Sequence, residues 1–167
     1  MERWKDDPRH SDMRFEMQLE ADAVVTAPPA LLSRVLDNLI SNAAKYSEAG
    51  TPIRIVAAAA SDEATIAVSD QGRGISSADQ ATVFEPFFRG KIARDAGIAG
   101  TGLGLAIAAR IAAALQGRLE CSSELGRGST FTLRLQTLEA PGSARESACT
   151  LDAASSGVAL PPGGAGG

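Results

Sequence analysis

Two asparagines and a lysine stand at helical spacing in the segment NLISNAAKYS. Asn38, Asn42 and Lys45 occupy positions i, i+4 and i+7, and side chains at this spacing share one narrow face of an α-helix. Amide oxygens are hard ligands that suit Mg²⁺, and an ammonium group is a compact charge that suits phosphate. The three residues therefore predict one wall of a Mg²⁺–phosphate site, although the solvated polar face of an amphipathic helix gives the same spacing.

A second motif, Asp70-Gln71-Gly72-Arg73-Gly74, follows a predicted strand. Glycines allow the backbone to approach a ligand closely and to adopt a positive φ. A carboxylate at the end of a strand can accept a hydrogen bond from an exocyclic amine such as that of adenine. An ordinary Asp-Gly turn remains the simpler interpretation of this motif on its own.

A third motif, Gly100-Thr101-Gly102-Leu103-Gly104-Leu105, leads directly into a predicted helix. Alternate glycines before a helix expose backbone N–H groups that, with the helix dipole, can bind phosphate. No strand precedes the glycines and no Lys-Ser or Lys-Thr follows them, so the motif is neither a Rossmann fingerprint nor a Walker loop. A flexible loop that enters a helix is the other interpretation.

Three of the five phenylalanines fall within the segment FEPFFRG. Phe84, Phe87 and Phe88 begin a stretch, residues 84–100, that has no hydrophobic period and is predicted to be a long loop. Long loops in compact domains are usually functional or mobile. The aromatic side chains could pin a lid to the domain, or they could form a small satellite core.

The elements that must position these motifs follow from hydrophobic periodicity. Residues 13–20 alternate, with Met13, Phe15, Met17 and Leu19 on one face, which predicts a half-buried strand. Residues 30–46 carry an apolar stripe at helical spacing. The remaining patterns predict strands at 53–59, 64–69, 117–123 and 129–136, a short helix at 77–83 and a second long helix at 102–115. This order favours an α+β fold, in which a mixed five-stranded sheet carries about three helices, two of them long, on one face.

Composition limits the class of protein. The 167 residues suit one domain, and the net charge of −4 without a block of Lys and Arg argues against nucleic-acid binding. No apolar run of about eighteen residues and no signal peptide occur, so no part of this sequence is expected to span a membrane. We expect a linker at residues 1–12, the folded domain at 13–136, and a disordered Ala/Gly/Pro-rich tail at 137–167.

The order and spacing of the motifs carry more weight than any single motif. NLISNAAKYS, DQGRGI, FEPFFRG and GTGLGLAIA occur in that order, and together they closely resemble the ATP-binding catalytic domain of bacterial sensor histidine kinases. The resemblance covers residues 13–136. It implies a two-layer α/β sandwich of the Bergerat type, which type II topoisomerases, heat-shock chaperones and mismatch-repair ATPases share.

The resemblance also implies roles for individual residues. Asn42 looks like the chief Mg²⁺ ligand, Asn38 like its partner, and Lys45 like a phosphate contact. Asp70 is similar to the family's adenine-binding acid. The other implied nucleotide contacts are Tyr46, Gly72, Gly74, Ile75, Arg89, Lys91, Gly100, Thr101, Gly102, Leu103 and Gly104.

The implied reaction is transfer of the γ-phosphoryl group of Mg²⁺–ATP to a histidine, because Asn38 stands where the ATPase branches of the superfamily carry a water-activating Glu. His10 is the only histidine and lacks the usual phosphoacceptor context, so the acceptor is expected on a separate dimerisation domain, with a response regulator downstream. A cytoplasmic location follows from this resemblance. An anti-sigma-factor-type serine kinase and a nucleotide-responsive binding module without catalysis are the alternatives.

Overall fold

The computed structural model describes residues 14–20, 24–48, 50–60, 62–95 and 97–137. Five strands form one sheet in the order β1-β2-β3-β5-β4, in which β1 and β2 are parallel and the other pairs are antiparallel. The sheet is therefore mixed, and the α+β prediction is confirmed. The strands are β1 (Arg14–Leu19), β2 (Pro52–Ala60), β3 (Glu63–Asp70), β4 (Arg118–Glu124) and β5 (Gly128–Gln136).

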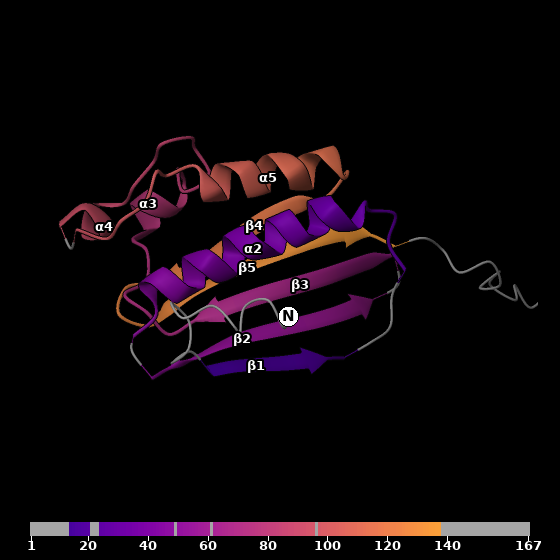
Figure 1. Cartoon of the computed structure of the whole chain (residues 1–167), viewed down its shortest axis with the longest axis horizontal. Coiled ribbons are helices and arrows are strands. Elements are labelled where there is room, and N and C mark those ends of the chain that lie inside the picture. The colour runs from indigo at the N-terminus through magenta and orange to yellow at the C-terminus, as the bar shows by residue number, and fades with distance from the viewer. Residues whose placement is uncertain (1–13, 21–23, 49, 61, 96, 138–167) are drawn as a thin grey trace, which may run out of the picture.

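Two long helices cover one face of the sheet. Helix α2 (Pro29–Tyr46) and helix α5 (Gly104–Ala114) lie side by side, and α2 packs on β3 and β2 (Figure 1). The short helices α3 (Ser77–Gln80) and α4 (Lys91–Asp95) lie beyond the N-terminal end of α5 (Figure 1). None of the helices in the described ranges is long and apolar enough to cross a lipid bilayer.

The register of the strands separates an apolar face from a polar one. Val68 pairs with Ile55 on one side and with Phe131 on the other, and all three side chains are buried beneath the helices. The opposite face carries a ring of ion pairs, in which Arg134 contacts Glu63 at 2.6 Å and Glu120 at 2.8 Å. The core therefore lies on the helix side, which is also the side on which the site is built.

The prediction for the first strand was right in position and wrong in burial. Phe15 is partly buried, but Met17 and Leu19 are 65% and 70% exposed. The reason is position, because β1 is an edge strand and α2 covers the neighbouring β2 and β3 instead. Met13 lies outside the described residues.

The helix boundaries differ from the predicted ones near the glycine motifs. The short helix ends at Gln80, and Ser76 caps its start by accepting the Asp79 N–H at 3.1 Å. The predicted loop at 84–100 contains the short helix α4. Helix α5 begins at Gly104 rather than at residue 102, because Gly102 has a φ of +71°, a left-handed conformation that cannot continue a right-handed helix.

Candidate functional site

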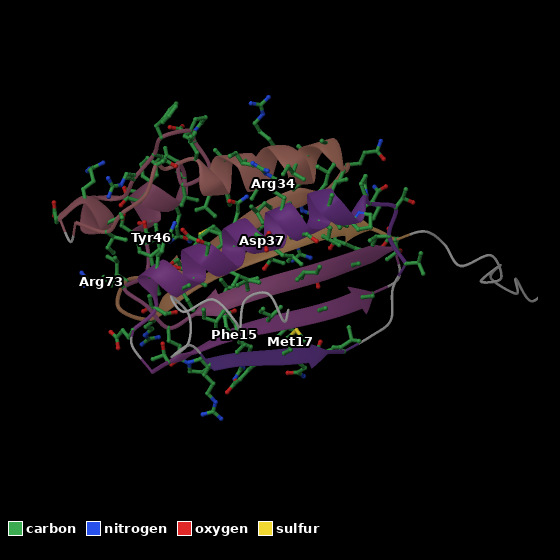
Figure 2. All side chains as sticks on the ribbon, viewed as in Figure 1. Phe15, Met17, Arg34, Asp37, Tyr46 and Arg73 are labelled. Atoms are coloured by element: carbon green, nitrogen blue, oxygen red, sulfur yellow. The ribbon has the colours of Figure 1, made fainter. Side chains whose placement is uncertain are left out.

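One cavity of about 160 Å³ brings most of the predicted site residues together. It lies between the C-terminal half of α2, the segment from 88 to 102, and the N-terminus of α5. Figure 2 shows Tyr46 and Arg73, both of which line the cavity, at the same end of the molecule. The predicted residues that line it are Asn38, Asn42, Lys45, Tyr46, Gly74, Ile75, Arg89, Gly100, Thr101, Gly102 and Gly104.

Four of the predicted site residues are not among the described residues that line the cavity. Asp70, Gly72 and Leu103 do not line the cavity, although each adjoins a residue that does. Lys91 begins α4, and its side chain lies outside the part of the chain that the structure describes.

The α2 wall presents an amide oxygen to the start of α5. Asn38 Nδ2 donates to the Arg34 carbonyl at 2.9 Å, and because a carbonyl can only accept, the other amide atom is the oxygen. A Cβ built on Gly104 would lie 3.3 Å from Asn38 Oδ1, so this oxygen faces the first residue of α5. Asn42 lines the same cavity one turn further along the helix.

This donor set fits a Mg²⁺ ion that is held mainly through phosphate. In the described ranges no group of three or more His, Cys, Asp and Glu side chains could hold a metal. Mg²⁺ commonly keeps few protein ligands and completes its shell with water and substrate phosphates. The Asn38 amide oxygen beside the N-terminus of α5, with Asn42 and Lys45 on the same wall, meets that requirement.

The buried acid lies behind the cavity, at the end of β3. Asp70 is 6% exposed and accepts the Gly72 N–H at 3.0 Å. Burial raises the pKa of this carboxyl from 3.8 to about 6, although the N–H groups of Gly72 and Ser129 lower it in part. Ser129 pairs with Asp70 in the sheet and lines the cavity, so the acid is one residue away from the cavity surface.

Two glycines after Asp70 let neighbouring backbone approach closely. A Cβ on Gly72 would lie 2.0 Å from the Tyr46 carbonyl oxygen, and one on Gly74 would lie 2.0 Å from that of Glu124. Gly74 also has a φ of +68°. A side chain at either position would force the loop away from α2 or β4 and change the shape of the cavity.

The aromatic segment divides among three surroundings. Phe84 packs edge-to-face on Phe131 with the ring centroids 6.3 Å apart, so it belongs to the main core. Phe88 lines the cavity, and Phe87 is 73% exposed with a φ of +63°. The Phe87 N–H donates to the Gly102 carbonyl at 3.0 Å, which ties the aromatic segment to the glycine motif.

Two arginine side chains form hydrogen bonds within the segment from 89 to 98, which we call the lid. Arg89 Nη2 donates to the Ile98 carbonyl, and Arg94 Nη1 donates to the Arg89 carbonyl. Arg89 also lines the cavity, and its charge lowers the pKa of Tyr46, which burial raises by more.

Sequence reasoning missed several lining residues. Asp79 and Ser129 gave no signal, because neither belongs to a spaced motif. Arg73 and Phe88 stood inside the motifs DQGRG and FEPFFRG but received no role in binding. The other lining residues that were missed are Ser41, Val83, Gly90, Ala93, Ala99 and Leu105.

Comparison with known proteins identifies the family of this chain. The family model described as histidine kinase-, DNA gyrase B- and HSP90-like ATPase matches residues 27–139. The sensor-like histidine kinase SenX3 of Mycobacterium tuberculosis is 40% identical over 144 residues, which cover 82% of this chain and 35% of SenX3. The sensor protein IrlS of Burkholderia pseudomallei is 40% identical over 128 residues, which cover 77% of this chain and 28% of IrlS.

Solved structures give the same result. The mycobacterial sensor histidine kinase MprB matches with a TM-score of 0.70 and 28% identity, over 81% of this chain and 88% of that one. Full-length ShkA in complex with AMPPNP matches with a TM-score of 0.68 and 30% identity, over 80% of this chain and 28% of that one. The chain thus spans about a third of the length of the curated relatives that it matches. It belongs to the family of histidine kinase-, DNA gyrase B- and HSP90-like ATPases, and the relatives that it matches include sensor histidine kinases.

Proposed function

We propose that this chain binds Mg²⁺–ATP in the cavity and transfers the γ-phosphoryl group to a histidine on a separate dimerisation domain. The observation that carries the proposal is the convergence of the α2 wall, the start of α5 and the loop after β3 on one cavity. The relationship to sensor histidine kinases supports it, as does the AMPPNP bound in the ShkA structure.

The phosphate end of the nucleotide lies between α2 and α5 in this proposal. The N–H groups at the start of α5, around Gly102 and Gly104, donate hydrogen bonds to phosphate oxygens as those of a helix N-terminus do. Asn42 and Asn38 hold Mg²⁺, which when bound neutralises charge that develops during transfer. Lys45 contacts a phosphate. Thr101, Leu103 and Gly100 complete this loop, and Arg89 and Lys91 reach the phosphates from the lid.

The base end lies at the loop after β3. Asp70 accepts a hydrogen bond from the adenine amine, and Gly72 and Gly74 keep the loop thin enough for the base to approach. Ile75 and Tyr46 supply apolar walls. Catalysis consists mainly of positioning and charge neutralisation, which is the usual protein contribution to phosphoryl transfer.

Transfer is favoured over hydrolysis by the residue types on α2. Asn38 cannot act as a base, whereas a Glu at this position could activate water. Asp79 is the one carboxylate among the described lining residues, and a Cβ on Gly90 would lie 3.1 Å from its Oδ2, so it sits against the lid. If the chain released phosphate rapidly, Asp79 would therefore be the candidate base that activates water.

We further propose the layout in which residues 13–136 form this catalytic domain, between a linker at 1–12 and a tail at 137–167. The phosphoacceptor histidine then belongs to another domain of the same parent chain or to a partner in trans. A response regulator receives the phosphoryl group downstream, in the cytoplasm. His10 lies outside the described residues and is expected to be a linker residue.

The proposal is tested with γ-labelled ATP. The purified chain should bind ATP without labelling itself or releasing phosphate quickly, and label should appear on the dimerisation domain of its parent protein when that domain is added. The transfer should be slow, since tethering normally supplies an effective concentration in the millimolar range. The label should be lost in acid, because phosphohistidine is acid-labile.

Three other outcomes would change the conclusion. Acid-stable label on a protein partner would favour the serine kinase, and ATP binding without any transfer would favour the binding module. Strong self-labelling that is abolished by His10→Ala would overturn our interpretation of the N-terminal segment.

A further inference from the structure

A network of side-chain hydrogen bonds fixes the loop that follows the base-binding glycines. Ser123 on β4 accepts the Ile75 N–H through its Oγ at 2.8 Å. Gln80 on α3 donates through Nε2 to the Ile75 carbonyl at 3.0 Å and to the Ser123 carbonyl at 2.9 Å. Both backbone groups of Ile75 are thus held by side chains, and Ile75 lines the cavity.

The direction of the remaining bonds in the network is forced. Ser123 Oγ lies 2.7 Å from the Gly128 carbonyl oxygen and 3.0 Å from Ser129 Oγ. Because a carbonyl can only accept, the single hydroxyl hydrogen of Ser123 is used on Gly128. The hydrogen between the two serines must therefore come from Ser129.

This direction determines what Ser129 offers to the cavity. Ser129 is 7% exposed, lines the cavity and pairs with Asp70 in the sheet. With its hydrogen donated to Ser123, the Ser129 Oγ can only accept. The base end of the cavity then has one acceptor at its surface, the Ser129 oxygen, and a second acceptor directly behind it, the carboxylate of the paired residue Asp70. A base with an exocyclic amine satisfies them, whereas a base with a carbonyl there places acceptor against acceptor.

We propose that Ser123 and Gln80 are positioning residues that select the amine-bearing base by fixing Ser129 as an acceptor and Ile75 as a wall. This inference rests on the proposed nucleotide site. It adds a device for specificity that contacts no part of the nucleotide, since neither Ser123 nor Gln80 lines the cavity.

The test compares ATP with inosine triphosphate, which carries a carbonyl in place of the adenine amine. Ser123→Ala frees the Ser129 hydroxyl to donate toward the cavity, and Gln80→Met removes both amide donors at similar side-chain length. Each should lower the preference for ATP over inosine triphosphate by about tenfold, the size expected when a hydrogen bond is lost or inverted. Ser123→Thr keeps the hydroxyl and should keep the preference.

Two further measurements separate positioning from loss of structure. The affinity of each variant for inorganic tripolyphosphate with Mg²⁺ should stay within about twofold of the wild-type affinity, because α2 and α5 hold the phosphates. Loss of a hydrogen bond to the phosphates would change this affinity by more than about twofold. Hydrogen exchange of the Ile75 amide should accelerate in Ser123→Ala. The exposed neighbours supply matched controls, Ser122→Ala on β4 and Gln71→Met in the loop.

The outcomes are distinct. A wild-type chain that binds no nucleotide refutes the proposed function itself. A wild type that prefers ATP, with both variants keeping that preference, refutes the inference about Ser123 and Gln80. Equal losses for ATP, inosine triphosphate and tripolyphosphate in both variants would also refute it, because the residues would then only stabilise the fold.

Discussion

The pKa of Asp70 connects the structure to a quantity that can be measured, the free energy of unfolding. Asp70 is the one ionisable side chain that is buried in the described residues, and burial raises its pKa from 3.8 to about 6. This rise in pKa corresponds to about 3 kcal/mol, which is the cost of keeping the Asp70 carboxylate ionised in the folded chain. Asp70→Asn removes that cost, because an amide cannot ionise but keeps one oxygen to accept the Gly72 N–H.

The sign of the effect follows from proton linkage. The pKa of Asp70 is higher in the folded than in the unfolded chain, so the folded chain binds more protons between about pH 4 and pH 6. The stability that protonation adds is fully present below about pH 4 and is lost as the pH rises through about 6. The wild type should therefore lose about 2 kcal/mol relative to Asp70→Asn between about pH 4.5 and about pH 7.5.

Asp70→Asn also carries a cost that does not change with pH, because its new amide group faces the Ser129 N–H and two donors then oppose each other. Urea unfolding at a series of pH values, without nucleotide, measures both proteins. Asp62→Asn is a matched control, since Asp62 is exposed. A difference between the wild type and Asp70→Asn that does not change with pH would refute the reasoning.

Three more predictions concern the nucleotide. Asn42→Ala should remove the Mg²⁺-dependent part of ATP affinity while the fold persists; unchanged metal dependence in calorimetric titrations would remove Asn42 from the site. Asp70→Ala should cost ATP binding about 1–3 kcal/mol, because an adenine amine is left unpaired, and should cost GTP less; equal losses would contradict the assignment. Trypsin cleavage after Lys91 and Arg94 should slow with a saturating Mg²⁺–ATP analogue, because phosphates supply contacts to the lid; an unchanged rate would count against nucleotide-coupled ordering.

Local patterns were sufficient for the five strands, the two long helices and the α2 wall, but they did not predict the short helix α4. The spacing of Asn38, Asn42 and Lys45 places them on one helix face whatever the rest of the chain does, and all three line the cavity. The alternation at residues 13–20 likewise predicted β1. It could not predict that Met17 and Leu19 would be exposed, because burial depends on which strands α2 covers.

The start of helix α5, next to a glycine motif, was another feature that local patterns did not predict correctly. A glycine permits both a helix and a left-handed turn, so the pattern could not separate the start of α5 from the loop before it. The structure places Gly102 in the turn, where the Phe87 N–H donates to its carbonyl. Contact with a distant segment therefore decided where the helix begins.

The sequence by itself was enough to predict the kind of site, because amide oxygens, a lysine and two glycine motifs depend on residue type and local spacing. Only the tertiary structure decided the neighbours of that site. Strand β5 lies between β3 and β4, which sets Ser129 beside Asp70 and within reach of Ser123. The register between strands is fixed by hydrogen bonds and packing between residues far apart in the chain, and no local period records it. The chemistry at this end of the cavity is therefore partly a property of the sheet rather than of any motif.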